Sequence, residues 1–354
     1  MIALLAASLL LFTAAPPPAR AADPKLASAC AAKKAGACLA LATDRLAAGD
    51  DAGAATAFRS ACELGEQAAC CELGAAMHLG KGVPKDLPKA RALYQKGCDG
   101  KAPRCCDNLG LVYLEGDGVK ADPSLAGTLF EKACAAGDAM GCLHQGTGLA
   151  SKDPKAAQAL FGKACDAGVL RGCALLGTAM AHTGEEPPRM AALLQKACDG
   201  GESAACVNLG NVLVSGRTLA IDYPRAAALF GKACQGTVTD GCGPLARLHF
   251  KGLGVAKDEA QAAGLYGLAC KGGNPESCAR LAELYSVGRG VEKSDEQSFL
   301  LFKQACAGND VDSCANVGMM LLRGLGTPAD PAKGAALIRK ACEVGSKGAC
   351  QMLK

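Results

Sequence analysis

Cysteines recur in pairs eight positions apart along most of this 354-residue chain. The step from one pair to the next is most often 36 residues. A fixed period in this range is typical of a solenoid built from repeated units and not of a single globule. The pairs account for all but two of the 22 cysteines, and they are Cys30–Cys38, Cys62–Cys70, Cys98–Cys106, Cys134–Cys142, Cys165–Cys173, Cys198–Cys206, Cys234–Cys242, Cys270–Cys278, Cys306–Cys314 and Cys342–Cys350.

The residues between two cysteine pairs predict two helices joined by a turn. In the unit that starts at Cys106, apolar residues such as Leu109 recur at helical spacing until Gly116. A second helix is expected to start at Asp122, a good N-cap that is followed by proline, and to end before Gly137. Each unit is therefore a helix, a turn and a second helix.

Small residues recur inside the first helix of the units. A glycine in a helix interior costs roughly 1 kcal/mol relative to alanine, so its recurrence requires a packing reason. We expect these residues to let the second helix approach the first closely. The column consists of Gly74, Gly110, Gly146, Gly177, Gly210, Ala246, Ala282 and Gly318.

The cysteine spacing predicts one disulfide between each unit and the next. The first cysteine of a pair falls in the last turn of a second helix, and its partner falls in the first turn of the following helix. In Cys165–Cys173 a turn containing Gly168 lies between them. Antiparallel helices that meet at such a turn can bring their Cα atoms within the 4.4–6.8 Å that a disulfide needs. A loop this short contributes about 2.5 kcal/mol in the chain-entropy model.

Cys71 and Cys105 remain outside this pattern, each next to a cysteine of a pair. They fall at the starts of the first helices of consecutive units, so an eleventh bridge, Cys71–Cys105, is the preferred interpretation. The alternative is a redox-active or metal-binding pair. That alternative is weaker because neither cysteine lies in a C-x-x-C arrangement and no histidine is placed beside them.

The N-terminal residues predict export. Residues 1–21 are apolar as far as three consecutive prolines and end in Ala-Arg-Ala, which fits a cleaved signal peptide and is too short to span a bilayer comfortably. Residues 22–37 are expected to form a capping segment. Lipidation at Cys30 is disfavoured because it lies far from the apolar run. Export to the periplasm or the medium would allow the cysteines to be oxidised, and no later stretch resembles a transmembrane helix.

Composition narrows the class of protein further. The chain is 50% apolar and 4% aromatic, and it contains no tryptophan. Short apolar side chains suit closely packed helices, and no strand pattern is evident, so an all-α fold is expected. The net charge is only +4 without a long basic run, which argues against nucleic acid as a partner.

The repeated motif resembles a known family. It reads C-x-x-L-G-x-x-Y, then G-x-G-V, then D-x-x-K-A-x-x-L-Y-x-K-x-C, and it is seen in residues 72–98 and, with substitutions, 279–306. This resembles Sel1-like repeats, relatives of tetratricopeptide repeats, and the C-x7-C pairs resemble those of the Helicobacter cysteine-rich proteins. The resemblance covers residues 38–350 and implies an α/α superhelical solenoid of about nine helix pairs, with residues 351–354 as a C-terminal tail.

The resemblance implies more than one function. Most Sel1-like proteins are adaptors that hold partner proteins in a groove. Some cysteine-rich members are described as penicillin-binding proteins with slow β-lactamase activity, and some exported or mitochondrial relatives handle haem or metal cofactors. No catalytic motif of the family can be carried over to residues of this chain.

A search for catalytic residues finds little. No serine has a lysine three positions later and Lys-Thr-Gly is absent, although serine β-lactamases need both. The four histidines are far apart in sequence, and each is expected to be an ordinary helix residue: His78, His144, His182 and His249. No cofactor or metal is therefore predicted, and an enzyme is less favoured than a binding protein.

A column of residues two positions after the second cysteine of each pair suggests a binding wall. It contains Glu72, Asn108, His144, Leu175, Asn208, Pro244, Arg280 and Asn316. Asparagine can donate to and accept from a peptide backbone at once, and in related peptide-binding repeats an asparagine at this place holds extended ligands. The candidate contacts are Asn108, His144, Asn208, Arg280 and Asn316. The alternative is that the asparagines bond neighbouring turns and only hold the repeats together.

The sequence thus favours an exported scaffold that binds a protein, a peptide or a cell-wall fragment, without nucleic acid and without a transmembrane anchor. A slow β-lactamase or penicillin-binding protein is the alternative, and a haem- or metal-handling factor is a weaker one.

Overall fold

The computed structural model describes residues 23–235 and 238–353. The predicted signal peptide, residues 1–21, lies outside this range. Within the described residues the chain is helical throughout and contains no strand. The chain divides into two compact units at residues 160 and 161, and each unit is described by itself below.

The first unit begins with a short helix and continues in helix pairs. Its helices are α1 (Pro24–Ala31), α2 (Ala35–Ala47), α3 (Asp51–Glu63), α4 (Gln67–Leu79), α5 (Leu87–Asp99), α6 (Pro103–Glu115), α7 (Pro123–Ala135), α8 (Ala139–Leu149) and the first part of α9 (Pro154–Asp166). The predicted capping segment thus contains α1, and α2 begins inside it.

The second unit holds the remainder of α9 and the later helices. These are α10 (Leu170–Thr183), α11 (Pro187–Asp199), α12 (Ser203–Ser215), α13 (Tyr223–Lys232), α14 (Cys242–Lys251), α15 (Glu259–Lys271), α16 (Pro275–Val287), α17 (Asp295–Ala307), α18 (Val311–Arg323), α19 (Pro331–Glu343) and α20 (Lys347–Met352).

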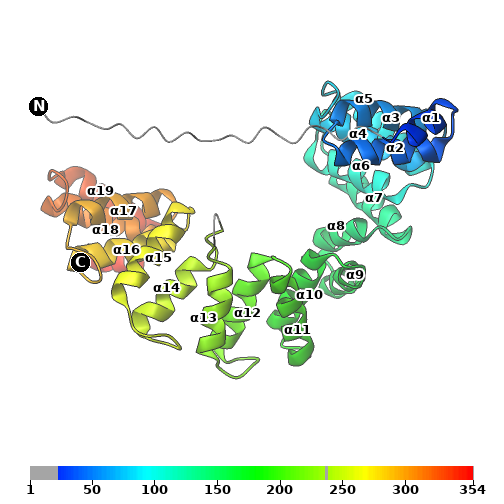
Figure 1. Ribbon diagram of the computed structural model, residues 1–354. Helices are drawn as coiled ribbons and strands as arrows, with labels where there is room; N and C mark the ends of the chain where they lie inside the picture. Colours follow the sequence, from blue (N-terminus) through cyan, green and yellow to red (C-terminus); the bar gives the residue numbers. More distant parts are fainter. Residues whose placement is uncertain (1–22, 236–237, 354) are drawn as a thin grey trace, which may run out of the picture. The chain divides into compact units, whose positions relative to one another are not determined.

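Helices that follow one another in the chain pack as antiparallel pairs within each unit (Figure 1). We call the even-numbered helices from α2 onward first helices and the odd-numbered helices from α3 onward second helices. A first helix packs on the second helix of its own repeat, as α6 does on α7, and the second helix packs on the next first helix, as α7 does on α8. This nearest-neighbour pattern confirms the α/α solenoid predicted from the cysteine period.

Side-chain caps and glycines set the helix ends where the sequence predicts them. Asp122 accepts a hydrogen bond from the backbone N–H of Leu125 at 3.0 Å and starts α7. Gly116 ends α6 in the left-handed conformation, at φ 78°. The same cap position starts most other second helices and is occupied by Asp50, Asp86, Asp222, Asp258, Ser294 and Asp330.

The small column in the first helices has the packing role expected of it. A Cβ atom added to Gly110 would lie 2.5 Å from Cε1 of Phe130 on α7, and one added to Gly318 would lie 2.7 Å from Cγ1 of Ile338 on α19. The repeats with glycine at this position therefore use the missing side chain to seat a bulky residue of the second helix.

The structure confirms disulfides between cysteines eight positions apart. Their Cα atoms lie 4.5 Å apart in Cys30–Cys38 and 4.8 Å apart in Cys62–Cys70, and the other eight pairs fall within this range. An eleventh bridge joins Cys71 on α4 to Cys105 on α6, with 5.1 Å between the Cα atoms. No described cysteine is free.

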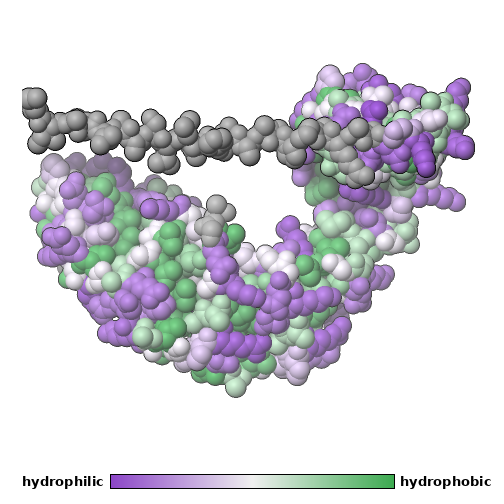
Figure 2. Space-filling view, in the orientation of Figure 1, coloured by the Kyte–Doolittle hydropathy of each residue, from purple (hydrophilic) through white to green (hydrophobic). Residues whose placement is uncertain are grey.

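The described surface mixes hydrophilic and hydrophobic residues, as the visible face in Figure 2 shows. Among the helices that the structure describes, none is long and apolar enough to cross a membrane.

Candidate functional site

The predicted column of binding residues lies on consecutive first helices, where several members bond to one another. In the first unit Glu72 on α4 pairs with Arg104 on α6, with 2.9 Å between Oε1 and Nη1. His144 on α8 contacts Asp107 on α6, with 2.7 Å between Nδ1 and Oδ1. Asp107 is buried, so these contacts form a polar connection between stacked first helices.

The three asparagines of the column differ in what they contact. Asn208 on α12 donates from Nδ2 to Oγ1 of Thr178 on α10 at 2.8 Å. This bond joins neighbouring first helices, which is the alternative role considered for the asparagines, namely holding the repeats together. Asn108 and Asn316 are half-buried, and their amides have no hydrogen-bond partner in the part of the chain that the structure describes. Unlike Asn208, these two asparagines do not join neighbouring first helices through their amides, and their role as ligand contacts stays a prediction.

One first helix in the second unit departs from the repeat. Every other first helix starts three residues before the second cysteine of its pair, as α16 does at Pro275, whereas α14 starts at Cys242 itself. Residues 238–241 are not helical. Their sequence, Val-Thr-Asp-Gly, consists of residues with low helix propensity. The first turn of α14 is therefore missing.

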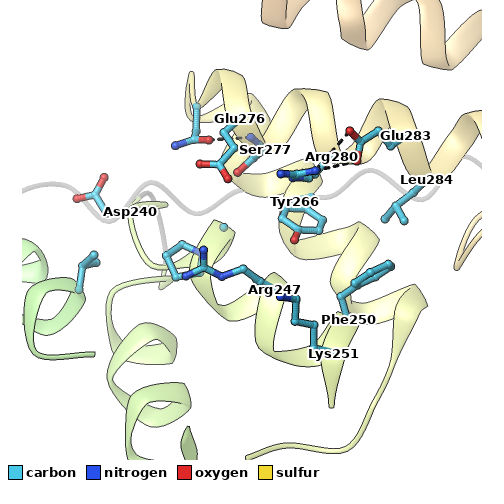
Figure 3. A pocket seen from close by; sticks show the side chains of 14 residues that line it. Asp240, Arg247, Phe250, Lys251, Tyr266, Glu276, Ser277, Arg280, Glu283 and Leu284 are labelled. Atoms are coloured by element: carbon cyan, nitrogen blue, oxygen red, sulfur yellow. Dashed lines mark hydrogen bonds and ion pairs between the residues drawn. The ribbon is translucent and has the colours of Figure 1, made fainter. Parts of the chain in front are cut away.

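A cavity of about 580 Å³ opens beside this irregular helix, between α14 and α16. Gly243 and Pro244 replace the larger residues usual at the start of a first helix and add to the space. Figure 3 shows Asp240 and Glu276 at the end where the two helices begin and Lys251 at the other end. The lining residues are Val207, Asp240, Gly243, Pro244, Arg247, Phe250, Lys251, Tyr266, Asn274, Glu276, Ser277, Arg280, Glu283 and Leu284.

Only one ion pair joins charged groups of the lining. Arg280 pairs with Glu283, with 3.1 Å between Nη1 and Oε2. Asp240 accepts a hydrogen bond from the hydroxyl of Ser203 at 3.2 Å. Arg247, Lys251 and Glu276 have no charged partner among the residues that the structure describes. The cavity thus holds charges of both signs, several of them uncompensated.

Tyr266 forms an inner wall of the cavity and is 7% exposed. Burial is the largest cause that raises the pKa of its phenol. The guanidinium groups of Arg280 and Arg247 act in the opposite direction. The carboxylates of Glu276 and Glu283 add to the increase. The phenol therefore stays protonated at neutral pH, within electrostatic range of two arginines and two glutamates.

A second, shallower cavity of about 380 Å³ lies in the first unit between α3, α4 and α5. Its apolar residues are Leu73, Met77 and Leu93, with Arg59 and Lys96 among the charged residues of the lining. No three His, Cys, Asp or Glu side chains are grouped as metal ligands anywhere in residues 23–235 and 238–353.

The sequence located part of this site. Arg280 and Pro244 come from the predicted column and line the larger cavity, whereas Asn208 and Asn316 do not, and Asn108 and His144 lie in the first unit. Sequence reasoning missed Arg247, Lys251, Tyr266, Asp240, Glu276 and Glu283. The available signal was Cys-Gly-Pro at residues 242–244, where other repeats read, for example, Cys-Asp-Asn at 106–108 or Cys-Ala-Asn at 314–316.

Comparisons with known proteins agree with this architecture. A family model described as the Sel1 repeat matches residues 67–101, 103–138, 139–169, 203–237, 245–274, 275–310 and 311–346. No curated protein matches the sequence.

Two solved structures show the same fold over most of the chain. The protective antigen c5321 of uropathogenic Escherichia coli, which displays an SLR fold, is 25% identical, with a TM-score of 0.69 over 92% of this chain and 80% of its own. A Sel1 repeat protein from Oxalobacter formigenes is 23% identical, with a TM-score of 0.67 over 84% of this chain and 89% of its own. Cysteine-rich protein B of Helicobacter pylori is 25% identical, with a TM-score of 0.31 over 39% of this chain and 98% of its own.

Proposed function

The chain belongs to the Sel1 repeat family, and on this premise we propose that it is an exported scaffold whose first helices bind an extended segment of a partner protein. Sel1-repeat solenoids are generally non-enzymatic scaffolds of a kind typical of protein–protein interaction.

The observation that carries the proposal is the state of two asparagine amides. Asn108 and Asn316 occupy the same position of their repeats, next to Leu109-Gly110 and Val317-Gly318. Their amides are half-buried and bond to no other described side chain or backbone group. A half-buried amide without a protein partner can exchange its hydrogen bonds to water for bonds to a peptide backbone, which gives a net gain of about 0.5–1.5 kcal/mol.

The disulfides support the export part of the proposal. All cysteines in the described residues are paired, which requires an oxidising compartment in ordinary cells. The partner is therefore expected among proteins of the cell envelope or the medium.

Site-specific photo-crosslinking in the native cell tests the scaffold. A photoreactive amino acid replaces Asn316 on α18, and the matched control replaces Leu300, which is 49% exposed on the adjacent second helix α17. We expect a discrete polypeptide to be crosslinked from position 316 and not from position 300. Equal crosslinking from both positions, or none from position 316, would contradict the proposal.

The captured segment then tests the asparagines directly. N316A should weaken the binding of the segment captured from position 316 about 2- to 10-fold, the value of one hydrogen bond, and N108A should do the same for a segment captured from position 108. N208A is the comparison, because its amide already bonds to Thr178. If N208A lowers the affinity as much as the other two substitutions do, the assignment of the Asn108 and Asn316 amides as ligand contacts is contradicted.

A further inference from the structure

We propose that the cavity between α14 and α16 binds a small zwitterionic ligand, a dipeptide or tripeptide with both termini free. This site is separate from the asparagine contacts described above, and it goes beyond the scaffold function. The proposal commits to an ammonium group at the Asp240–Glu276 end and a carboxylate beside Arg247 and Lys251.

The cavity exists because the repeat is broken at one place. The loss of the first turn of α14, together with Gly243 and Pro244, opens the wall that other repeats close. A Cβ added to Gly243 would lie 2.7 Å from the hydroxyl oxygen of Ser277, so a side chain at this position would require that hydroxyl to shift. Departures from an otherwise regular pattern are expected at functional sites.

The charges of the lining balance and thereby restrict the ligand. Three basic residues, Arg247, Lys251 and Arg280, face three acidic ones, Asp240, Glu276 and Glu283. A phosphate or another polyanion would meet carboxylates, and a simple cation would meet guanidinium groups, and both arrangements are repulsive. A ligand that carries one charge of each sign and no net charge fits the lining best.

The lining charges that lack an ion-pair partner lie at different heights along the axes of α14 and α16. Arg280 is already paired with Glu283, which leaves Arg247 and Lys251 as the cations available to a ligand. Asp240 and Glu276 lie at the end where the helices begin, and Lys251 lies at the far end, with the arginines between them (Figure 3).

The spacing of these levels sets the length of the ligand. Arg247 and Glu283 hold the same position of their repeats, five residues after the second cysteine, and Glu276 lies seven residues before Glu283. This places the Glu276 and Arg247 levels about 10 Å apart along the axis. An extended peptide advances about 3.5 Å per residue, so its ammonium and carboxylate groups reach these levels in about two or three residues. The cavity volume of about 580 Å³ is in the ordinary range for small-ligand sites.

The remaining lining residues suit the body of such a peptide. The buried Tyr266 places a phenol in the wall, and Phe250 and Leu284 provide apolar surface toward the Lys251 end. Phe250 is held in place by the guanidinium of Arg289, which lies 4.5 Å from the centroid of its ring. These groups can contact a peptide side chain while the charged residues hold the termini.

A peptide pool tests the proposal. The probes are mixtures of Xaa-Trp and Xaa-Xaa-Trp in four forms: free, N-acetylated, C-amidated and doubly capped. Retention of each peptide behind an ultrafiltration membrane is measured by mass spectrometry. Because the protein has no tryptophan, the affinity of each retained peptide follows from the fluorescence of the probe alone.

We expect free peptides to be retained and each cap to weaken binding about tenfold or more, the loss of one charge-assisted contact. Free tryptophan should not be retained, because its charges are too close together to reach both levels. Absence of retention across the pool, or equal binding of free and capped peptides, would overturn the proposal.

Two exposed substitutions assign the ends of the ligand. R247Q should reduce the preference for a free carboxylate over an amide, since only Lys251 remains beside that group, and should leave the preference for a free amine. E276Q should do the reverse. K303Q, on the exposed surface of α17, is the matched control and should change neither. Preferences that stay the same in R247Q and E276Q would also overturn the proposal. The crosslinking from Asn316 is an independent experiment, so failure of the peptides leaves the scaffold function standing.

Discussion

At the residue scale, the position before the first cysteine of a pair shows how closely side chains and disulfides are matched. This position is alanine in most repeats and is buried there, as in Ala133, Ala197 and Ala305. In α5 it is Gly97. A Cβ at Gly97 would collide with Sγ of Cys105, so the glycine makes room for the Cys71–Cys105 bridge. The glycine at position 97 and the Cys71–Cys105 bridge therefore depend on each other.

This match between Gly97 and the bridge predicts that the effect of one substitution on stability depends on the bridge. G97A should destabilise the wild-type protein by about 1–3 kcal/mol through overpacking against the bridge. In a C71A/C105A background the same change should cost much less, because the Sγ contact is gone, although Cβ of residue 105 at 3.0 Å and the carbonyl oxygen of Gln67 at 3.2 Å remain close to the added methyl group. Denaturant unfolding of the four proteins measures both effects. An equal effect in the two backgrounds would contradict the matching of Gly97 to the bridge.

Ser298 is a second residue at which the repeat predicts an outcome. It is fully buried in α17, and its hydroxyl has no hydrogen-bond partner among the described residues. The same position is a buried alanine in other second helices, such as Ala126 and Ala262. S298A should therefore raise the free energy of unfolding by about 1 kcal/mol, because an unpaired buried hydroxyl is removed.

The nearby Ser294 serves as the control for this prediction. It caps α17 by accepting a hydrogen bond from the N–H of Gln297 at 3.2 Å, so S294A should lower the free energy of unfolding by about 1 kcal/mol. Thermal and denaturant unfolding report both changes. Destabilisation by S298A would show that its hydroxyl has a partner.

At the element scale, ion pairs connect the start of a second helix with the turn of the next repeat. Glu259, in the first turn of α15, bonds to Arg289 in the turn after α16 and to Lys257, whose Nζ lies 3.1 Å away. Hydrogen bonds from Arg289 and then from Lys257 lower the pKa of the Glu259 carboxyl to about 2, from the ordinary 4.5.

The lowered pKa predicts a pH dependence of stability. Because the folded-state pKa lies below the unfolded one, the contribution of Glu259 is fully present above pH 4.5 and is lost as the pH falls toward 2. The difference in unfolding free energy between wild type and E259Q should therefore shrink across this window. The free energy of unfolding of both proteins is measured at pH 6, 4 and 2.5. A wild-type-minus-E259Q difference that stays constant would contradict the lowered pKa of Glu259.

Some features of the helices could be predicted from the sequence, and others could not. Caps such as Asp122 and terminators such as Gly116 could be read directly, because they act within one or two turns of the chain. The missing first turn of α14 could not be located from the cysteine period, since Cys234 and Cys242 keep the regular separation although α13 ends early and α14 starts late. The larger cavity depends on that local loss of helix. Its charged residues, such as Arg247 and Glu276, look like ordinary surface residues in the sequence.

At the scale of the whole molecule, the fold followed from one repeated constraint. Each cysteine pair joins a second helix to the next first helix, so contacts stay between neighbours and the alanine-rich helices need little bulky core. This is why the period alone predicted the solenoid. The ligand could not be predicted in the same way. Packing between adjacent repeats determines where the helices lie, but it does not determine which exposed side chains they carry.

The central claim is that every repeat is joined to the next through sulfur. Intact-mass analysis of the mature protein, denatured and treated with an alkylating reagent without reduction, tests it most directly. We predict no alkylated thiol, and complete alkylation of all cysteines only after reduction. About twenty alkylated thiols in the unreduced protein would contradict the stapled solenoid and the exported location inferred from it.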